Sequence, residues 1–361
     1  MKVIVFNYAL EMGGTDRVAV ELSNIFSNGG IDVTFLTMKK RQCDYFILNP
    51  SVKRLDLGFV ADDQADSGVS YLGFRAFKSF FKMFVLLAKE RPEFLVSNWT
   101  SVNCFALLAA LPFKTKVVCV EHIHFAQPSK LWQWFRKLTY WTAHRVVCLT
   151  DKDLADYERI GARAEKIYNP LTVEVSRPSK REGKRFIAVG RLELQKGFDI
   201  LINSFRLVLD QHPDASLDIY GDGTQRSALS MLISELKLED SINLRGATKD
   251  ISGAYSRSDF FVLSSRFEGF GLVIIEAQAH GLPVVAFDCP RGPAEIISDR
   301  VNGLIAKDGS VTDLAMRMLE LIENPELCAQ MVDSAYVSNK RFGHESIRTE
   351  WLTKVFGRLY V

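Results

Sequence analysis

Two glutamates bracket a glycine-rich turn in the run Ser265-Arg-Phe-Glu-Gly-Phe-Gly-Leu-Val-Ile-Ile-Glu276. Gly269 and Gly271 let the backbone approach a ligand closely, and the amides that follow them can face an anion from the start of a helix. Glu268 and Glu276 add carboxylates that accept hydrogen bonds from hydroxyl groups. The pattern suits a charged, polyhydroxylated ligand. The alternative is a strand, loop and helix with incidental glycines and acids.

A second loop supplies positive charge. The run Gly190-Arg-Leu-Glu-Leu-Gln-Lys-Gly197 directly follows an apolar segment. Arg191 can place two parallel hydrogen bonds on phosphate oxygens, and Lys196 adds a point charge beside them. Such cations stabilise a diphosphate leaving group, because its negative charge grows as the bond to a sugar breaks. Ordinary surface cations on a solvated loop are the alternative.

The loop after the first apolar segment, Glu11-Met-Gly-Gly-Thr-Asp-Arg17, contains another pair of glycines. Gly13 and Gly14 permit a tight turn, and Thr15 or Asp16 can cap the helix that follows. The G-x-G-x-x-G pattern of dinucleotide-binding proteins is missing. This loop alone is also consistent with plain structure.

Three more loops directly follow apolar segments. Tyr220-Gly-Asp-Gly223 and Gly246-Ala-Thr-Lys-Asp250 lie in the second half, at the same predicted sheet edge as Arg191 and Glu268. His122 ends a run in the first half, where an imidazole can donate to a sugar hydroxyl or exchange a proton. A structural histidine is the alternative there.

Alternating apolar and amphipathic stretches must position these loops. We predict strands at the following apolar segments: 2–7, 32–37, 94–97, 116–120, 145–149, 185–189, 216–220, 242–245, 260–263, 283–286 and 303–305. Such alternation favours parallel sheets covered by helices on both faces, which bind ligands at the carboxyl ends of their strands. The predicted fold is therefore α/β, with two doubly wound Rossmann-like domains facing a central cleft.

The domain boundaries follow from a break in this pattern. The run from Pro170 to Lys184 is polar, contains two prolines and has no clear period, which is typical of a linker. We therefore predict an N-terminal domain at 1–170, a linker at 171–184 and a C-terminal domain at 185–344. A helix within 345–361, over Glu345–Arg358, is expected to cross back toward the first domain.

Composition narrows the class of protein. The 361 residues exceed one ordinary domain, and 47% hydrophobic with 24% charged residues is usual for a soluble globular protein. A net charge of +2 gives no reason to expect nucleic-acid binding. Six scattered cysteines suggest neither a zinc site nor a disulfide framework. The chain begins without a signal-peptide pattern and contains no apolar run of about 20 residues, so we expect a cytoplasmic protein.

Two aromatic and basic stretches, 71–89 and 131–141, are helix candidates in the first half. Either can lie on an anionic membrane surface with its cations facing the headgroups. The alternative is a pair of core helices whose lysines and arginines reach into water.

In this order, the motifs resemble the family 4 retaining glycosyltransferases of the GT-B fold, over nearly the whole chain. The segment Asp288-Cys-Pro-Arg-Gly-Pro293 is similar to bacterial polysaccharide and O-antigen members. The features that carry the resemblance are Gly13-Gly14, Glu121-His122, Asn169-Pro170, Gly190-Arg191-Leu192, Lys196-Gly197, Gly221-Asp222-Gly223, Glu268 with Glu276, and Asn302-Gly303-Leu304.

The resemblance implies four catalytic residues. Arg191 and Lys196 should bind the donor diphosphate, and Glu268 should lie near the donor sugar or stabilise positive charge at its anomeric carbon. His122 should touch that sugar from the first domain.

The remaining donor-binding residues are implied in the same way. Glu276 should accept hydrogen bonds from the ribose hydroxyls, and Gly14 should leave room for phosphate or acceptor. The base should rest between the Gly221–Gly223 turn and the Ala247–Lys249 turn that contains Thr248. Backbone amides that assist the diphosphate would come from Phe270, Gly271 and Leu272.

The activity implied is hexosyl transfer from a UDP-sugar, with retention and without a metal or other cofactor. No Asp-x-Asp motif stands in the usual acidic loop, and no protein nucleophile is expected. The donor would carry a hexose or N-acetylhexosamine. The acceptor would be a saccharide, polyprenyl-diphosphate-linked, at the inner face of the cell membrane. A sugar-nucleotide epimerase or hydrolase of the same fold, and a non-catalytic nucleotide-sugar-binding subunit, are the alternatives.

Overall fold

The computed structural model describes residues 1–40, 44–59, 69–176 and 183–357, with only the backbone at 69–76. The chain forms two compact units, Met1–Thr172 with Gly343–Val361, and Val173–Phe342. These divisions lie close to the predicted boundaries at 170 and 344. In the predicted linker, residues 171–176 form neither helix nor strand, and 177–182 lie outside the described residues.

The first unit contains a parallel sheet in the order β3-β2-β1-β4-β5-β6-β7. Its central strands are apolar runs buried along nearly their whole length, as expected where helices cover both faces of a sheet. The strands are β1 Lys2–Asn7, β2 Asp32–Lys39, β3 Lys53–Phe59, β4 Phe94–Asn98, β5 Lys116–Val120, β6 Arg145–Cys148 and β7 Ala164–Lys166.

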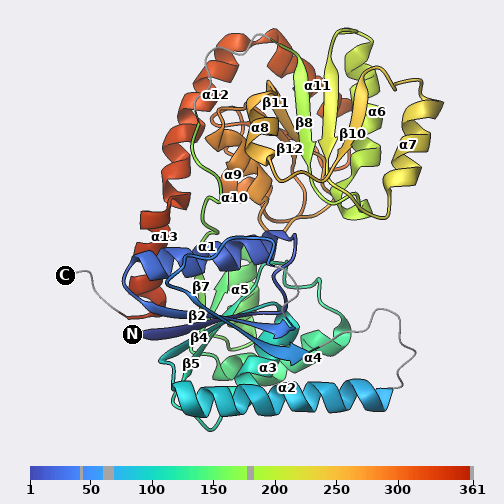
Figure 1. Cartoon of the computed structure of the whole chain (residues 1–361). Coiled ribbons are helices and arrows are strands. Elements are labelled where there is room, and N and C mark those ends of the chain that lie inside the picture. Colours follow the sequence, from blue (N-terminus) through green and yellow to red (C-terminus); the bar gives the residue numbers. More distant parts are fainter. Residues whose placement is uncertain (41–43, 60–68, 177–182, 358–361) are drawn as a thin grey trace. The chain divides into compact units, whose positions relative to one another are not determined.

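The helices of this unit join successive strands (Figure 1). The segment 71–89 forms the helix that we predicted, whereas the segment 131–141 ends its α-helix at Thr139 and continues as a 3₁₀ turn, Tyr140–Thr142. The helices between its strands are α1 Gly14–Asn28, α2 Val69–Glu90, α3 Thr100–Ala110, α4 Lys130–Thr139 and α5 Asp151–Arg159, and α13, His344–Glu350, belongs to the C-terminal part of the unit.

The second unit has a parallel sheet in the order β10-β9-β8-β11-β12-β13. Its strands are β8 Arg185–Val189, β9 Ser216–Tyr220, β10 Ile242–Gly246, β11 Phe260–Leu263, β12 Val284–Phe287 and β13 Leu304–Ala306. Its helices are α6 Phe198–Leu209, α7 Arg226–Glu235, α8 Ile251–Ser256, α9 Leu272–Ala279, α10 Pro293–Ile296, α11 Val311–Glu323 and α12 Pro325–Ser338.

Strand order reverses once in each sheet. In the first unit β1 lies between β2 and β4, and in the second unit β8 lies between β9 and β11. In sheets of this kind the loops on either side of the reversal diverge and leave a ligand crevice at the carboxyl ends of the strands. In the second unit, those are the loop with Arg191 and Lys196 after β8 and the loop with Glu268 after β11.

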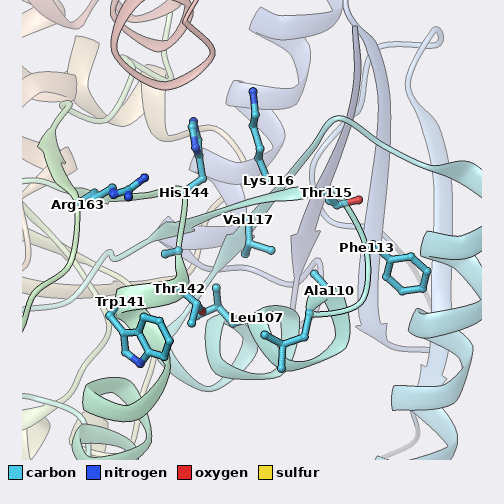
Figure 2. Close-up of a pocket in the computed structure, with 12 residues that line it drawn as sticks. Leu107, Ala110, Phe113, Thr115, Lys116, Val117, Trp141, Thr142, His144 and Arg163 are labelled. Atoms are coloured by element: carbon cyan, nitrogen blue, oxygen red, sulfur yellow. The ribbon is translucent and has the colours of Figure 1, made fainter.

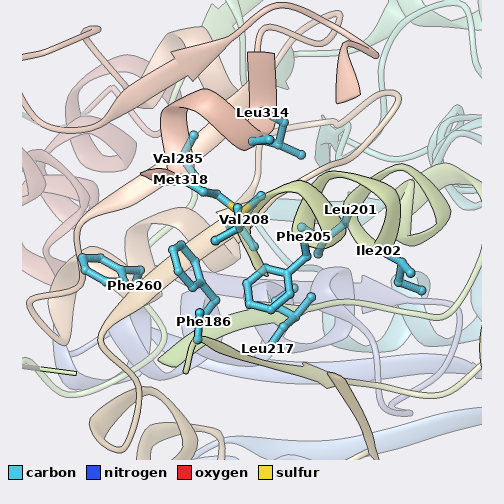
Figure 3. Close-up of a cluster of buried hydrophobic side chains, with 14 of the residues drawn as sticks. Phe186, Leu201, Ile202, Phe205, Val208, Leu217, Phe260, Val285, Leu314 and Met318 are labelled. Atoms are coloured by element: carbon cyan, nitrogen blue, oxygen red, sulfur yellow. The ribbon is translucent and has the colours of Figure 1, made fainter. Parts of the chain in front are cut away.

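Each unit has its own apolar core. Figure 3 shows the second core, where Phe186 of β8 lies between Phe205 of α6 and Phe260 of β11, with ring centroids 5.6 and 4.9 Å away. Met318 and Leu314 reach the same cluster from α11. These contacts fix β8 and β11, and with them the two loops at the strand reversal.

Two sequence expectations need correction. The strand list missed β3 and β7, which are edge strands with mostly half-buried or exposed side chains and therefore lack a continuous apolar run. The final helix is also not continuous over Glu345–Arg358. Helix α13 spans His344–Glu350, and a π-helical turn, Trp351–Val355, follows it, while Arg358 lies outside the described residues. The Trp351 ring packs against both Phe26 and Phe356, which also contact each other.

Five cysteines are free and buried, and Cys43 lies outside the described residues. Within the part of the chain that the structure describes, no helix combines the length and apolarity that crossing a membrane requires.

Replacing Trp351 should destabilise the first unit strongly. Its side chain is 1% exposed and packs edge-on against Phe26, with ring centroids 5.2 Å apart. We expect Trp351→Ala to cost about 3–5 kcal/mol, because it leaves a large apolar cavity. Trp134→Ala, at a side chain 55% exposed, should cost less than about 1 kcal/mol. Urea unfolding followed by circular dichroism measures both, and equal losses would contradict the packing role.

Candidate active site

The loop after β8 is shaped by a close contact between its backbone and that of the loop after β11. Gly197 has φ 61°, and a Cβ atom there would stand 2.1 Å from the carbonyl oxygen of Ser264, at the end of β11. Only glycine fits both conditions. Lys196 is thereby held directly over the neighbouring loop, and its stem packs against Gly190.

Lys196 and Glu268 form an ion pair at this point. The Nζ atom lies 2.7 Å from Oε1 of Glu268, and Ser265 Oγ donates to the same oxygen at 2.6 Å. Both side chains are largely shielded, with 16% of Lys196 and 8% of Glu268 exposed. Ser264 Oγ also donates to the carbonyl of Lys196 at 2.9 Å. The structure therefore brings together two residues that are 72 positions apart in the sequence.

Further bonds fasten the same two loops. Arg266 makes a forked ion pair with Asp199 at 2.7 and 2.8 Å and donates to the carbonyl of Leu194. Gln195 donates to the carbonyl of Phe267 and accepts from the amide of Arg266. The guanidinium of Arg266 lowers the pKa of Asp199, which keeps that carboxylate charged. The two loops are thus one rigid element.

Arg191 differs from its neighbours because it is exposed. Among the described residues its side chain takes part in no hydrogen bond or ion pair. The adjacent Glu193 instead holds Thr224, accepting from both its amide and its hydroxyl group. The Arg191 guanidinium is therefore available to an anion at the carboxyl end of β8.

Helix α9 starts beside this cluster. Its N-cap Gly271 has φ 96°, and the amides of Gly271 and Leu272 donate to no group among the described residues. The Phe270 side chain is buried against Phe342, with ring centroids 5.7 Å apart. A Cβ at Gly292 would stand 2.6 Å from the carbonyl of Phe270, so the loop after β12 supports this turn from behind. These amides can receive an oxyanion.

Glu276 lies on α9 and is buried. Tyr255 donates a hydrogen bond to its Oε2 at 3.1 Å, and the tyrosine ring packs on His280 with centroids 5.1 Å apart. A buried carboxylate held by a neutral phenol can still accept from ligand hydroxyl groups.

The remaining predicted donor residues lie at the same sheet edge. Gly221 has φ 140°, and a Cβ there would stand 1.9 Å from the carbonyl of Gly190. A Cβ at Gly223 would stand 2.5 Å from the carbonyl oxygen of Leu192. Thr248 accepts a hydrogen bond from the Asp250 amide at 3.0 Å, which shapes the turn after β10. Glycine is required in the β9 turn because it touches the β8 loop.

His122, at the end of β5 in the first unit, has a defined protonation state. Its Nε2 lies 2.8 Å from Oδ1 of Asn98, whose Nδ2 donates to the Phe6 carbonyl. That bond orients the Asn98 oxygen toward the ring, so Nε2 carries the proton. Nδ1 is buried and has no partner among the described residues, and burial lowers the pKa of His122 to about 4. The ring is therefore a neutral hydrogen-bonding group near pH 7.

Glu121 supports this turn from inside the unit. It accepts hydrogen bonds from Tyr140, Thr100 and Asn103. Burial raises its pKa, and these three donors together with the nearby charge of Arg136 oppose that shift. The network fixes the backbone just before His122.

The loop before α1 departs from one expectation. Neither Thr15 nor Asp16 caps the helix, because the N-cap is Gly13 and makes no side-chain hydrogen bond. Asp16 instead lies beneath the loop, accepting from the Glu11 amide and from Asn7, and burial raises its pKa to about 6. Gly14 is the first residue of the helix, at the carboxyl end of β1.

Sequence reasoning missed Trp99. It follows β4 directly, beside the strand reversal of the first sheet, and is a non-glycine residue at φ 76° with a partly exposed ring. Strained backbone of this kind concentrates at functional sites. A single aromatic residue after an apolar run was the signal available in the sequence.

Comparisons with known proteins match both units. Residues 12–174 match the model described as Glycosyltransferase Family 4, and residues 174–338 match Glycosyl transferases group 1. The amylovoran biosynthesis glycosyltransferase AmsD of Erwinia amylovora is 30% identical over 353 residues, covering 94% of this chain and 95% of its own. The chain belongs to glycosyltransferase family 4.

Two further matches extend across this glycosyltransferase. A GalNAc-alpha-(1->4)-GalNAc-alpha-(1->3)-diNAcBac-PP-undecaprenol alpha-1,4-N-acetyl-D-galactosaminyltransferase of Campylobacter jejuni is 24% identical, covering 98% of this chain and 97% of its own. The crystal structure of Anabaena HepE in complex with UDP and glucose has a TM-score of 0.80 at 17% identity, covering 99% of this chain and all of that one. The predicted fold of two Rossmann-like α/β domains of the GT-B type is confirmed.

Substituting Gly197 should test the close approach in this glycosyltransferase. Gly309 is a matched control, because its φ of 67° is similar but a Cβ there meets nothing within 4 Å. We expect Gly309→Ala to cost about 1–2 kcal/mol for the left-handed backbone alone. Gly197→Ala should cost about 1–3 kcal/mol more, because Ser264 must move. Unfolding free energies from urea titration decide this, and equal costs would refute the contact.

The lowered pKa of His122 predicts how its contribution to stability depends on pH. A pKa near 4 lies below the unfolded value of about 6.5, so folding favours the neutral ring. Its stabilising contribution should be complete above about pH 6.5 and fall as the pH drops toward 4. The NMR signal of the His122 imidazole can be assigned because it disappears in His122→Gln. Its pH titration should have a midpoint near 4. A midpoint near 6.5 would show that the ring is solvated.

Proposed function

We propose that this glycosyltransferase transfers a hexose or N-acetylhexosamine from a UDP-sugar, with retention, to a lipid-linked saccharide in cell-surface polysaccharide synthesis. The observation that carries the proposal is the Lys196–Glu268 pair beside the exposed Arg191 at the strand reversal of the second unit. Cations and a carboxylate in one place suit a diphosphate joined to a sugar.

The donor would lie along the carboxyl edge of the second sheet. Arg191 and Lys196 would hold the diphosphate, and the free amides of Gly271 and Leu272 would add two donors. Lys196 has three N–H donors, so it can reach phosphate while it remains near Glu268. The complex of HepE with UDP and glucose supports a UDP-sugar as donor.

Glu276 and Glu268 would recognise hydroxyl groups on the two sides of the donor diphosphate. Glu276 would accept from the ribose, and Glu268 would contact the transferred sugar through Oε2, because Lys196 and Ser265 already occupy Oε1. The base would rest by the turns that contain Gly221 and Thr248. The His122 ring would contact the sugar as a neutral group.

Transfer would proceed on one face of the sugar. The bond from the anomeric carbon to the diphosphate breaks, the acceptor oxygen bonds to that carbon on the same face, and its proton passes to the leaving phosphate oxygen. Charge on the leaving group would be balanced by Arg191 and Lys196, which supports a reaction that needs no metal. Activity unchanged by EDTA would agree with this proposal, and a covalent sugar trapped on either glutamate would refute it.

Two observations support a lipid-linked acceptor at the inner face of a membrane. The printed name of the C. jejuni relative specifies an undecaprenol-linked substrate. The helices α2 and α4 of this chain also expose aromatic side chains next to lysines, which suits peripheral contact with anionic lipid.

Nucleotide binding should show which nucleotide the sugar donor carries. We expect UDP to raise the thermal unfolding temperature more than GDP, ADP or CMP, because a ligand at about one hundred times its Kd adds about 2.7 kcal/mol. Lys196→Ala and Glu276→Ala should each weaken the shift. Lys184→Ala, which removes an ion pair with Asp214 elsewhere in the same unit, should preserve it. If no nucleotide shifts the transition, the donor-site assignment fails.

A further inference from the structure

A pocket of about 320 Å³ opens at the edge of the first sheet where its strands begin. Lys116 starts β5, His144 directly precedes β6 and Arg163 directly precedes β7, so all three line the edge opposite to His122. Figure 2 shows these three basic side chains together along one side of the pocket. Nothing in the proposed donor chemistry uses them.

The charge in this pocket is uncompensated. None of the lining side chains is acidic, and both Lys116 and Arg163 are exposed. Among the described residues neither forms a hydrogen bond or ion pair through its side chain, although Lys116 lies over the Phe94 ring. Burial lowers the pKa of His144, its hydrogen bond to the Val355 carbonyl opposes that shift, and the neighbouring cations Arg145, Lys116 and Arg163 lower the pKa further. The pocket therefore favours an anion.

The opposite side of the pocket is apolar and reaches the surface. Leu107 and Val117 form part of its lining, while Leu111 and Trp141 are 63% and 64% exposed. Trp141 already donates its Nε1 hydrogen bond to the Leu138 carbonyl, so its ring can be buried at no polar cost. We call the exposed side chains at the ends of α3 and α4 the α3–α4 apolar surface: Leu108, Leu111, Leu138 and Trp141.

This surface continues onto α2. Phe84 of α2 packs against Phe113, which also lines the pocket, with ring centroids 4.9 Å apart. Phe77 and Phe81 are exposed on the same helix. Figure 1 places α2, α3 and α4 on one side of the first sheet and α1 on the other. A broad apolar face thus borders a small cationic pocket.

We propose that the pocket binds the phosphate headgroup of an anionic phospholipid while the α3–α4 apolar surface enters the lipid layer. A soluble phosphate compound would match the cations, but it would leave Leu111 and Trp141 in water. A phospholipid matches both, because its phosphate lies directly above its acyl chains. The inference rests on the membrane contact proposed above and gives it a specific lipid-binding site, yet it involves no donor-site residue.

Vesicle sedimentation with the purified full chain tests this site. Wild type should bind vesicles that contain phosphatidylglycerol and bind phosphatidylcholine vesicles weakly. Lys116→Gln/Arg163→Gln should lower the affinity for anionic vesicles by about tenfold or more, because each cation near such a surface contributes several-fold. Lys152→Gln/Arg159→Gln removes two exposed cations from α5 of the same unit and should change it less. Trp141→Ala should weaken binding without altering the preference for anionic lipid.

Three outcomes would overturn the proposal. The two double variants would lose affinity equally if net charge alone drove binding. Soluble glycerol phosphate would compete fully with vesicles if the ligand were a free phosphate compound. Wild type would ignore both vesicle types if the face served another kind of partner.

A UDP thermal-shift measurement separates this proposal from the proposed function. Lys116→Gln/Arg163→Gln should keep the wild-type nucleotide shift, which also shows that it folds. If vesicles bind but no nucleotide does, the lipid site survives and the transferase assignment fails.

Discussion

The backbone contact between Gly197 and the Ser264 carbonyl is the constraint from which the donor site follows. Two loops that leave neighbouring strands meet there with no room for a side chain. The Arg266–Asp199 fork and the Gln195 amide then fasten them. Lys196 and Glu268 end up within hydrogen-bond distance without either loop having to order when a ligand arrives. Binding energy is then available for the transition state rather than for assembling the site.

The first unit achieves the same rigidity by a different route. Arg136 is fully buried, with its guanidinium carbon 3.7 Å from the centroid of the Phe125 ring, and none of its side-chain nitrogens has a hydrogen-bond partner among the described residues. Its charge opposes the rise that burial causes in the pKa of Glu121, which accepts hydrogen bonds from three neutral donors. Charges buried in this way are costly to separate, so the turn that carries His122 resists rearrangement.

Sequence reasoning identified most of the strands and the loops at their carboxyl ends. It succeeded because central parallel strands are continuous apolar runs, and because Gly14, Gly197, Gly221 and Gly271 stand where strands give way to helices. It missed β3 and β7, since edge strands need no such run. The Arg266–Asp199 tether, the buried position of Asp16 and the strained Trp99 depend on contacts between distant segments, which a single sequence does not reveal.

The tryptophans are distributed very unevenly between the two units. All five of them, Trp99, Trp132, Trp134, Trp141 and Trp351, belong to the first unit. Four are partly or largely exposed, and one is in the core. Emission under selective tryptophan excitation therefore reports on the first unit alone, whereas circular dichroism reports on both. A loss of helical signal with unchanged emission would reveal that the second unit opens by itself, so the wild-type chain carries its own optical label for distinguishing its halves.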